Sequence, residues 1–293
     1  MAVATAPQMD SLLQALAGKG VRVETVVPPT ADLHEVELRP SQVRSLREAQ
    51  LIVRPGRDND TWAAEALKQV DGEQVDAAKG LPGSQRHWWM DPAFASKAAG
   101  TIANALNRLD PDGQAARATA LRELQVDLAA IDQQTKTCLA TVPDAGRGIV
   151  TDHDAAGAYA ERYGLTVVGT ISPGADPEAA PSAQRVAELE DLMRAKHVAA
   201  LFPIAPHGSA LAKTIAERGG AVLGDPLWAD ALPGATHDHE AEAEDTGEHA
   251  DHTAEEHAAA AVVPTLQEAA RLNGASVAKA LGAKSSACSS LSS

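Results

Sequence analysis

The sequence lacks the short motifs that mark the common nucleotide-binding and hydrolytic folds. The 293-residue chain contains no GxGxxG, no GxxxxGK[ST], no GxSxG and no HExxH. These patterns cradle phosphates, expose a nucleophilic serine or place two zinc ligands on one helix face. Their absence removes the main support for a dehydrogenase, a P-loop enzyme, a serine hydrolase or a metalloprotease of that type.

Basic residues and long apolar runs are also scarce. Lys and Arg number 25 against 40 Asp and Glu, a formal charge of −15, which argues against a nucleic-acid partner. The longest apolar run, residues 258–263, is far shorter than the roughly 20 residues that span a bilayer. We expect no transmembrane segment, and residues 1–10 lack the basic and apolar regions of a signal peptide.

The chain has only two cysteines, Cys138 and Cys288. Two cysteines at this separation make neither a CxxC motif nor a disulfide-rich scaffold. One bridge is possible, and it would close a loop of about 150 residues, worth on the order of 5 kcal/mol in the chain-entropy model. Such a bridge would indicate an oxidising compartment. Two unpaired thiols remain the alternative.

Short β-branched runs alternate with helical patterns along most of the chain, which is typical of α/β proteins with parallel sheets. We predict an N-terminal α/β lobe over residues 1–109. Asp91-Pro92 supplies an N-cap and a first-turn proline for its last helix. The expected strands are 21–27, 51–53 and, more weakly, 74–77, and the expected helices are 40–50, 61–70 and 92–109.

A long helix is predicted over residues 110–141, where Leu121, Leu124, Leu128 and Ile131 continue one apolar stripe. It would connect the lobes as a strut of roughly 35–40 Å. A second α/β lobe follows over 142–293, and we expect its Ser-rich end after Gly282 to be disordered. Its expected strands are 148–151, 165–171, 198–202 and 221–223, and its expected helices are 155–163, 182–196, 209–218 and 265–281.

Residues 237–257 follow neither pattern. They hold five of the ten histidines and nine acidic residues, with no Lys or Arg. Their apolar content is almost entirely alanine, so we expect a flexible loop. A solvated acidic loop is the alternative, but imidazole and carboxylate together suit divalent metals such as zinc. The expected secondary metal-capture residues are His237, His239, His249, His252 and His257.

Three histidines and one aspartate each follow a predicted strand. They are His34, His87, His153 and Asp225. In open α/β sheets, ligands bind beyond the carboxyl ends of the strands. Three neutral imidazoles and one carboxylate satisfy a four-coordinate zinc ion, so we predict that these residues bind a metal. The alternative for each histidine is a loop residue bonded to the backbone.

Two further histidines fit a metal site less well. His197 ends a predicted helix, where a cation complements the helix dipole, so a structural role is favoured. His207 follows Pro206 in the second lobe and is a possible substitute ligand.

Four segments resemble the zinc- and manganese-binding solute-binding proteins of bacterial ABC importers, the family called cluster A-I. They are PPTADLHEVELRP at 28–40, HWWMDP at 87–92, VTDHDAAGAYAERYGL at 150–165 and GDPLWADAL at 224–232. The resemblance extends from about residue 3 to 282. It implies two α/β lobes joined by a long rigid helix, with the metal held between them.

The resemblance also implies a function. His34 and His87 would bind the metal from the first lobe, and His153 and Asp225 from the second. Manganese-binding members tend to place a carboxylate at the third position, so His153 favours Zn²⁺ over Mn²⁺. We expect a non-enzymatic, monomeric receptor that delivers zinc to a membrane permease. Its location would be periplasmic or extracellular and membrane-associated, with the export signal absent from this chain.

Two alternatives stay open. A periplasmic zinc buffer or chaperone would have the same metal site without a partner importer. A three-histidine zinc hydrolase would leave one coordination position for water, with Glu35 or Asp154 as the candidate base. No catalytic motif supports the hydrolase.

Overall fold

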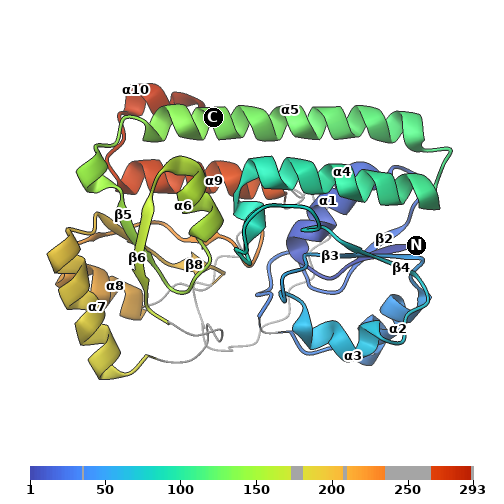
Figure 1. Cartoon of the computed structure of the whole chain (residues 1–293), viewed down its shortest axis with the longest axis horizontal. Helices are drawn as coiled ribbons and strands as arrows, with labels where there is room; N and C mark the ends of the chain where they lie inside the picture. Colours follow the sequence, from blue (N-terminus) through green and yellow to red (C-terminus); the bar gives the residue numbers. More distant parts are fainter. Residues whose placement is uncertain (35, 173–180, 207–209, 235–264, 292–293) are drawn as a thin grey trace, which may run out of the picture.

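Two parallel sheets, one in each lobe, organise the molecule (Figure 1). The computed structural model describes residues 1–34, 36–172, 181–206, 210–234 and 265–291. The fold class expected from the sequence, two α/β lobes with parallel sheets and a long helix, is confirmed. The segment 237–257 and His207 lie outside the described residues.

The first sheet contains four parallel strands in the order β2-β1-β3-β4. The strands are β1 (Ala2–Ala4), β2 (Val23–Thr25), β3 (Leu51–Arg54) and β4 (Glu73–Asp76). Helices α1 (Pro7–Ala17) and α4 (Pro92–Leu109) cover one face, and α2 (Pro40–Glu48), η1 (Thr61–Ala63) and α3 (Ala64–Leu67) cover the other.

Strand β1 shows why both faces of this sheet are buried. Successive side chains of a strand point to opposite faces. Ala2 and Ala4 pack in the core under α1 and α4, whereas Val3 packs with Leu46 and Leu67 of α2 and α3. Because both faces are covered, the strand is continuously apolar rather than alternating.

The second sheet has the order β6-β5-β7-β9 and is also parallel. Its strands are β5 (Gly148–Thr151), β6 (Thr166–Thr170), β7 (Ala200–Phe202) and β9 (Val222–Leu223). Helices α7 (Ala183–Lys196) and α8 (Ala210–Gly219) pack on the face that carries Val150 and Leu201. The opposite face joins the main core, to which α6 (Gly157–Tyr163) and α9 (Leu266–Ala280) contribute.

A short parallel pair, β8 (Ile204–Ala205) and β10 (Leu227–Trp228), forms a separate two-stranded sheet in the second lobe. The sequence did not predict either strand. Two residues give too short a pattern for a period-2 signal. Asp230 lies two residues after the end of β10.

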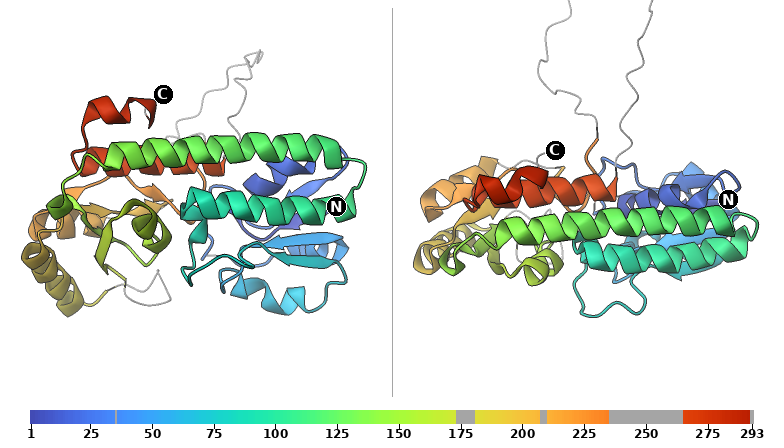
Figure 2. Two further views of the ribbon diagram at one scale, coloured as in Figure 1. Left: turned by 45° about the horizontal axis from the view of Figure 1, so that its top comes forward. Right: turned by 90° about the horizontal axis from the view of Figure 1, so that it is seen from above.

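Helix α5 (Gln114–Leu139) joins the lobes and extends over both of them (Figure 2). Its buried residues Leu124, Leu128, Ile131 and Thr135 recur every three to four positions, which places them on one face. Helices α4 and α9 pack along it, with α9 beneath the end nearer the second lobe in Figure 1. No helix in the described part of the chain is long and apolar enough to cross a bilayer.

The expectation of a disordered end after Gly282 is wrong. Residues Ser285–Cys288 form α10, and Ser289–Leu291 form η4. Cys138 of α5 and Cys288 of α10 form a disulfide, which confirms the bridge that the sequence left open. Leu291 is buried against α9. One covalent bond and one buried side chain hold a segment whose composition alone indicates disorder.

Candidate metal centre

His34, His87 and His153 meet around the carboxylate of Asp230, between the two lobes. One potential ligand atom from each residue lies within 4.8 Å of all the others. The Asp230 oxygens lie 2.7 Å from Nε2 of His87, 3.2 Å from Nε2 of His153 and 3.3 Å from Nε2 of His34. The three ring centroids are 5.3–5.6 Å apart. The three predicted histidines are therefore brought together.

The site is almost closed to solvent, and its charges suit a cation. Asp230 is fully buried and His87 is 2% exposed. Burial opposes ionisation of Asp230, but the facing imidazoles, His87 first, outweigh it and hold the pKa of the carboxyl well below its ordinary value. Burial lowers the pKa of His87. The site thus presents an ionised carboxylate and a neutral imidazole at neutral pH, the forms that bind metal ions.

His34 has the opposite shift. Burial, the largest single influence, disfavours its charged form, but the combined attraction of the Asp230 and Asp32 carboxylates outweighs burial and raises the pKa of this imidazole. A metal ion at the site would therefore compete with a proton at His34.

Several lone pairs in the site have no hydrogen-bond partner. Nε2 of His34, Nε2 of His153 and Oδ2 of Asp230 are buried without one. Nε2 of His153 lies 3.2 Å from Oδ2 of Asp230 and Nε2 of His34 lies 3.3 Å from its Oδ1, close enough for electrostatic attraction but without hydrogen-bond alignment. Unpaired buried polar groups are costly, and these converge on one point. An N3O set of this kind fits a tetrahedral divalent ion such as zinc.

His87 is held by a neighbouring loop of the first lobe. The Arg57 guanidinium donates hydrogen bonds to the carbonyls of Leu81, Pro82 and Gln85. Asn59 donates to the Arg86 carbonyl at 2.9 Å. His87 then caps η2 (Trp88–Met90), which leads into α4. The loop that delivers the histidine is therefore fixed along its length.

His34 and His153 are fixed by short local contacts. The Asp32 carboxylate accepts the backbone N–H of His34 at 2.6 Å. The His153 carbonyl accepts the Thr151 hydroxyl and the Ala155 N–H, at 2.7 and 2.8 Å. His153 directly follows β5, as the sequence predicted, so its position comes from the second sheet.

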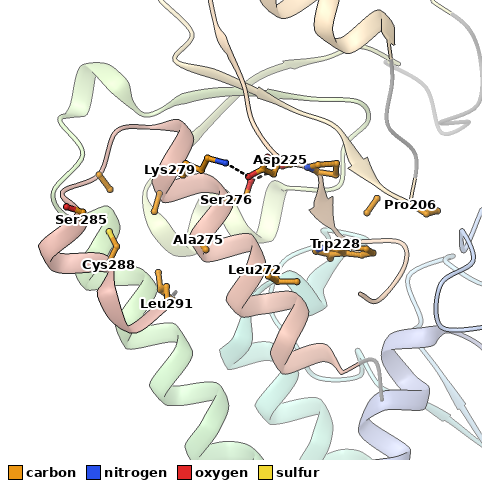
Figure 3. A pocket seen from close by; sticks show the side chains of 14 residues that line it. Pro206, Asp225, Trp228, Leu272, Ala275, Ser276, Lys279, Ser285, Cys288 and Leu291 are labelled. Carbon is orange, nitrogen blue, oxygen red and sulfur yellow. Dashed lines mark hydrogen bonds and ion pairs between the residues drawn. The ribbon is translucent and has the colours of Figure 1, made fainter. Parts of the chain in front are cut away.

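Asp225, the carboxylate expected at this site, lies elsewhere, and Asp230 occupies its place. The Asp225 side chain is 63% exposed and pairs with Lys279 at 2.9 Å. Figure 3 shows it pointing toward Lys279 on α9, at the edge of a pocket of about 650 Å³ between α9 and the C-terminal helices. An exposed, ion-paired carboxylate has no unpaired buried lone pair to offer.

The error follows from the missed strand. Both aspartates lie in GDPLWADAL, and both follow a strand. Asp225 comes two residues after the end of β9, whereas Asp230 comes two residues after the end of β10. Asp230, like Asp225, lies beyond a strand end, but its strand, β10, was not recognised in the sequence. The three apolar residues Leu227, Trp228 and Ala229 before Asp230 were the available signal.

Of the two less favoured histidines, His197 lies outside the site. His197 is exposed and ends α7 in a left-handed conformation, with φ of 50°, consistent with the structural role expected for it. His207 lies outside the described residues.

Comparison with known proteins identifies the family. The model of the family "Zinc-uptake complex component A periplasmic" (ZnuA) matches residues 2–260. The chain belongs to this family. Its members are transport receptors rather than enzymes, which sets the hydrolase alternative aside.

Characterised relatives bind several metals. The high-affinity zinc uptake system protein ZnuA of Paracoccus denitrificans is 27% identical over 279 residues, covering 78% of this chain and 84% of that protein. The ZnuA protein of Yersinia pestis is 27% identical over 213 residues, covering 60% and 66%. The iron-binding protein YfeA of Yersinia pestis is 25% identical, covering 79% and 78%. Sequence similarity at this level therefore spans more than one metal.

Solved structures share the fold. A crystal structure of ZnuA superposes with a TM-score of 0.69 at 25% identity, covering 78% of this chain and 91% of that chain. A manganese-bound periplasmic metal-binding protein of Candidatus Liberibacter asiaticus superposes with a TM-score of 0.79 at 18% identity, covering 96% and 98%. The second likeness supports the two-lobe architecture alone.

Proposed function

We propose that this protein captures Zn²⁺ with His34, His87, His153 and Asp230 and delivers it to the permease of an ABC importer. The observation that carries the proposal is the convergence of buried, unpartnered imidazole nitrogens on a buried carboxylate. Four protein ligands complete a tetrahedral shell and leave no position for a catalytic water. Such a site fits a receptor rather than a catalyst.

Zinc is favoured over manganese by the ligand chemistry. Imidazole suits zinc, whereas manganese prefers sites built mainly from oxygen ligands. This site offers three imidazoles and one carboxylate. Mn²⁺ is the minor candidate because two relatives named as manganese-binding lipoproteins are 23% identical to this chain in sequence.

The disulfide and the four-residue site also bear on the compartment and the oligomeric state of the protein. The disulfide between Cys138 and Cys288 indicates an oxidising compartment outside the cytoplasm, as expected for a periplasmic or surface-anchored receptor. All four ligands come from one chain, so a monomer suffices to bind the ion.

Metal content and zinc titration of the purified protein test the proposal. We expect one tight equivalent in the wild type and a loss of affinity of at least about 100-fold in Asp230→Ala or His153→Ala, because each removes a ligand. Asp225→Ala is the matched control. It removes a carboxylate five residues away that is exposed and paired with Lys279, and it should bind like wild type.

Two further variants separate the alternatives. Deletion of residues 237–257 should lower the total zinc bound at high concentration and leave the tight equivalent intact. Tight binding that disappears only with this deletion would contradict the four-residue site. Loss of zinc uptake in cells carrying Asp230→Ala would support delivery to a permease, whereas unchanged uptake would favour the zinc buffer.

A further inference from the structure

The segment that carries Asp230 is bonded to the first lobe, although it belongs to the second half of the chain. The Ala229 carbonyl accepts two hydrogen bonds of 2.8 Å, one from the Gln8 amide of α1 and one from the Trp89 indole of η2. Two residues after Asp230, the N–H of Leu232 donates to the Pro29 carbonyl at 2.7 Å. Asp230 therefore lies between two anchors on the first lobe.

The preceding residues are held by the second half of the chain instead. Leu227 donates its N–H to the Pro203 carbonyl at 2.8 Å. The Asn273 amide of α9 accepts the Trp228 N–H at 2.7 Å and donates to the Trp228 carbonyl at 3.0 Å. The chain thus passes from one set of partners to the other between Trp228 and Ala229.

The anchor on Ala229 lies in a dry environment. Gln8 and Trp89 are each 1% exposed, and Ala229 is fully buried. Both lone pairs of one carbonyl are satisfied by side-chain donors from two different elements. Hydrogen bonds are electrostatically stronger in a low-dielectric interior, and an unpaired carbonyl there is costly. The carboxylate on the next residue has little freedom to move away from His87.

His153 is supported by the second lobe, unlike the other three site residues. Its carbonyl is bonded by Thr151 and Ala155, its neighbours in the second lobe. His34 and His87 follow strands of the first sheet. Asp230 is likewise held by the first lobe, through the hydrogen bonds of Ala229 and Leu232.

We propose that Gln8 and Trp89 are positioning residues that fix Asp230 to the first lobe, so that three of the four zinc ligands form one preorganised unit and His153 is the ligand supplied by the second lobe. This inference rests on the proposed function. Residues that orient metal ligands from outside the coordination shell typically change affinity by 10- to 100-fold when substituted.

The first test is zinc affinity, by competition with a chelator, in Gln8→Met and in Gln14→Met. Methionine keeps the length of glutamine but donates no hydrogen bond. Gln14 lies on the same helix but is exposed and bonded only locally, to Asp10, so it is the matched control. We expect Gln8→Met to weaken zinc binding at least tenfold and to change the Co²⁺ absorption spectrum, and Gln14→Met to change neither.

The second test is the same substitution in Asp230→Ala. If Gln8 acts through Asp230, Gln8→Met should cause no further loss of affinity once the carboxylate is gone. Trp89→Phe removes the other donor to the Ala229 carbonyl while keeping an aromatic ring. It should weaken zinc binding when Asp230 is present and cause no further loss in Asp230→Ala. An equal loss with and without Asp230, or no loss at all in a folded variant, would overturn the positioning role.

The same measurements distinguish a failure of the positioning role from a failure of the proposed zinc-binding function. A wild-type protein that binds no zinc tightly would contradict the proposed function. Tight wild-type binding together with unchanged affinity in both Gln8→Met and Trp89→Phe would contradict only the positioning role.

Discussion

Two carboxylates five positions apart have opposite environments. Asp225 is exposed and paired with a lysine, whereas Asp230 is fully buried and faces three imidazoles. The difference comes from their surroundings, since the residue type is the same. A third carboxylate, Asp132 on α5, is held by cations rather than by histidines.

Asp132 should make stability depend on acid pH. It accepts two hydrogen bonds from Arg162 of α6, at 2.6 and 2.9 Å, and one from Lys136, at 2.9 Å. Burial opposes ionisation, but these cations outweigh it and lower the pKa of Asp132. Because the folded value is below the unfolded value, the contribution is complete above about pH 4. It is lost as the pH falls through the folded value.

Asp132→Asn should therefore destabilise the protein by about 1.5–3 kcal/mol at pH 7, and the difference from wild type should shrink at more acid pH. Urea denaturation at a series of pH values measures this. Asp127→Asn, an exposed change on the same helix, is the control and should have little effect. A difference in the free energy of unfolding between wild type and Asp132→Asn that does not change with pH would contradict the stabilising role of the ionised Asp132.

Most helices and strands could be predicted from the sequence. Helix α4 matches its predicted bounds because Asp91 caps it and proline starts it, and these signals are local. The predicted helix at 110–141 and α5 differ mainly at the N-terminus. Local capping and apolar periodicity thus located these two helices, whereas α1 was not predicted.

Elements defined by tertiary contacts were missed. Strand β1 is Ala-Val-Ala, and its burial is decided by helices on both sides. Strand β10 has two residues and exists because β8 pairs with it. Alanine and very short strands carry little local preference. The carboxylate of the site depended on such an element, so the histidines were predicted and Asp230 was not.

The C-terminal helix α10 should depend on its disulfide. The bridge between Cys138 and Cys288 closes 150 residues, and the chain-entropy model gives about 5 kcal/mol for loops of this length. Cys138→Ala/Cys288→Ala should lower the free energy of unfolding by roughly 2–5 kcal/mol, measured by guanidinium denaturation. Reducing agent should destabilise the wild type and leave the double variant unchanged. Equal sensitivity of the two proteins would be incompatible with this role.

The site lies where the two lobes meet, so only the folded state can form it. His87 and His153 belong to different sheets, and Asp230 is separated from both by long stretches of chain. A ligand that binds only the folded state stabilises it by mass action.

Zinc should therefore raise the melting temperature. At a free concentration 100 times the dissociation constant, the gain is about 2.7 kcal/mol, which corresponds to several degrees for a protein of this size. Differential scanning calorimetry with zinc and with a chelator measures the shift. Asp225→Ala should retain it and Asp230→Ala should lose most of it. A zinc-dependent shift that persists in Asp230→Ala would place the binding elsewhere.

The anchoring of residues 229–232 on the first lobe also has a consequence for biogenesis. The chain emerges from the ribosome from its N-terminus, so His34 and His87 are synthesised long before the carboxylate that faces them. The first lobe cannot acquire Asp230 or bury Leu232 until most of the second lobe has followed. An incomplete chain therefore lacks the complete four-residue site. The metal can be selected only in the compartment in which the whole polypeptide folds.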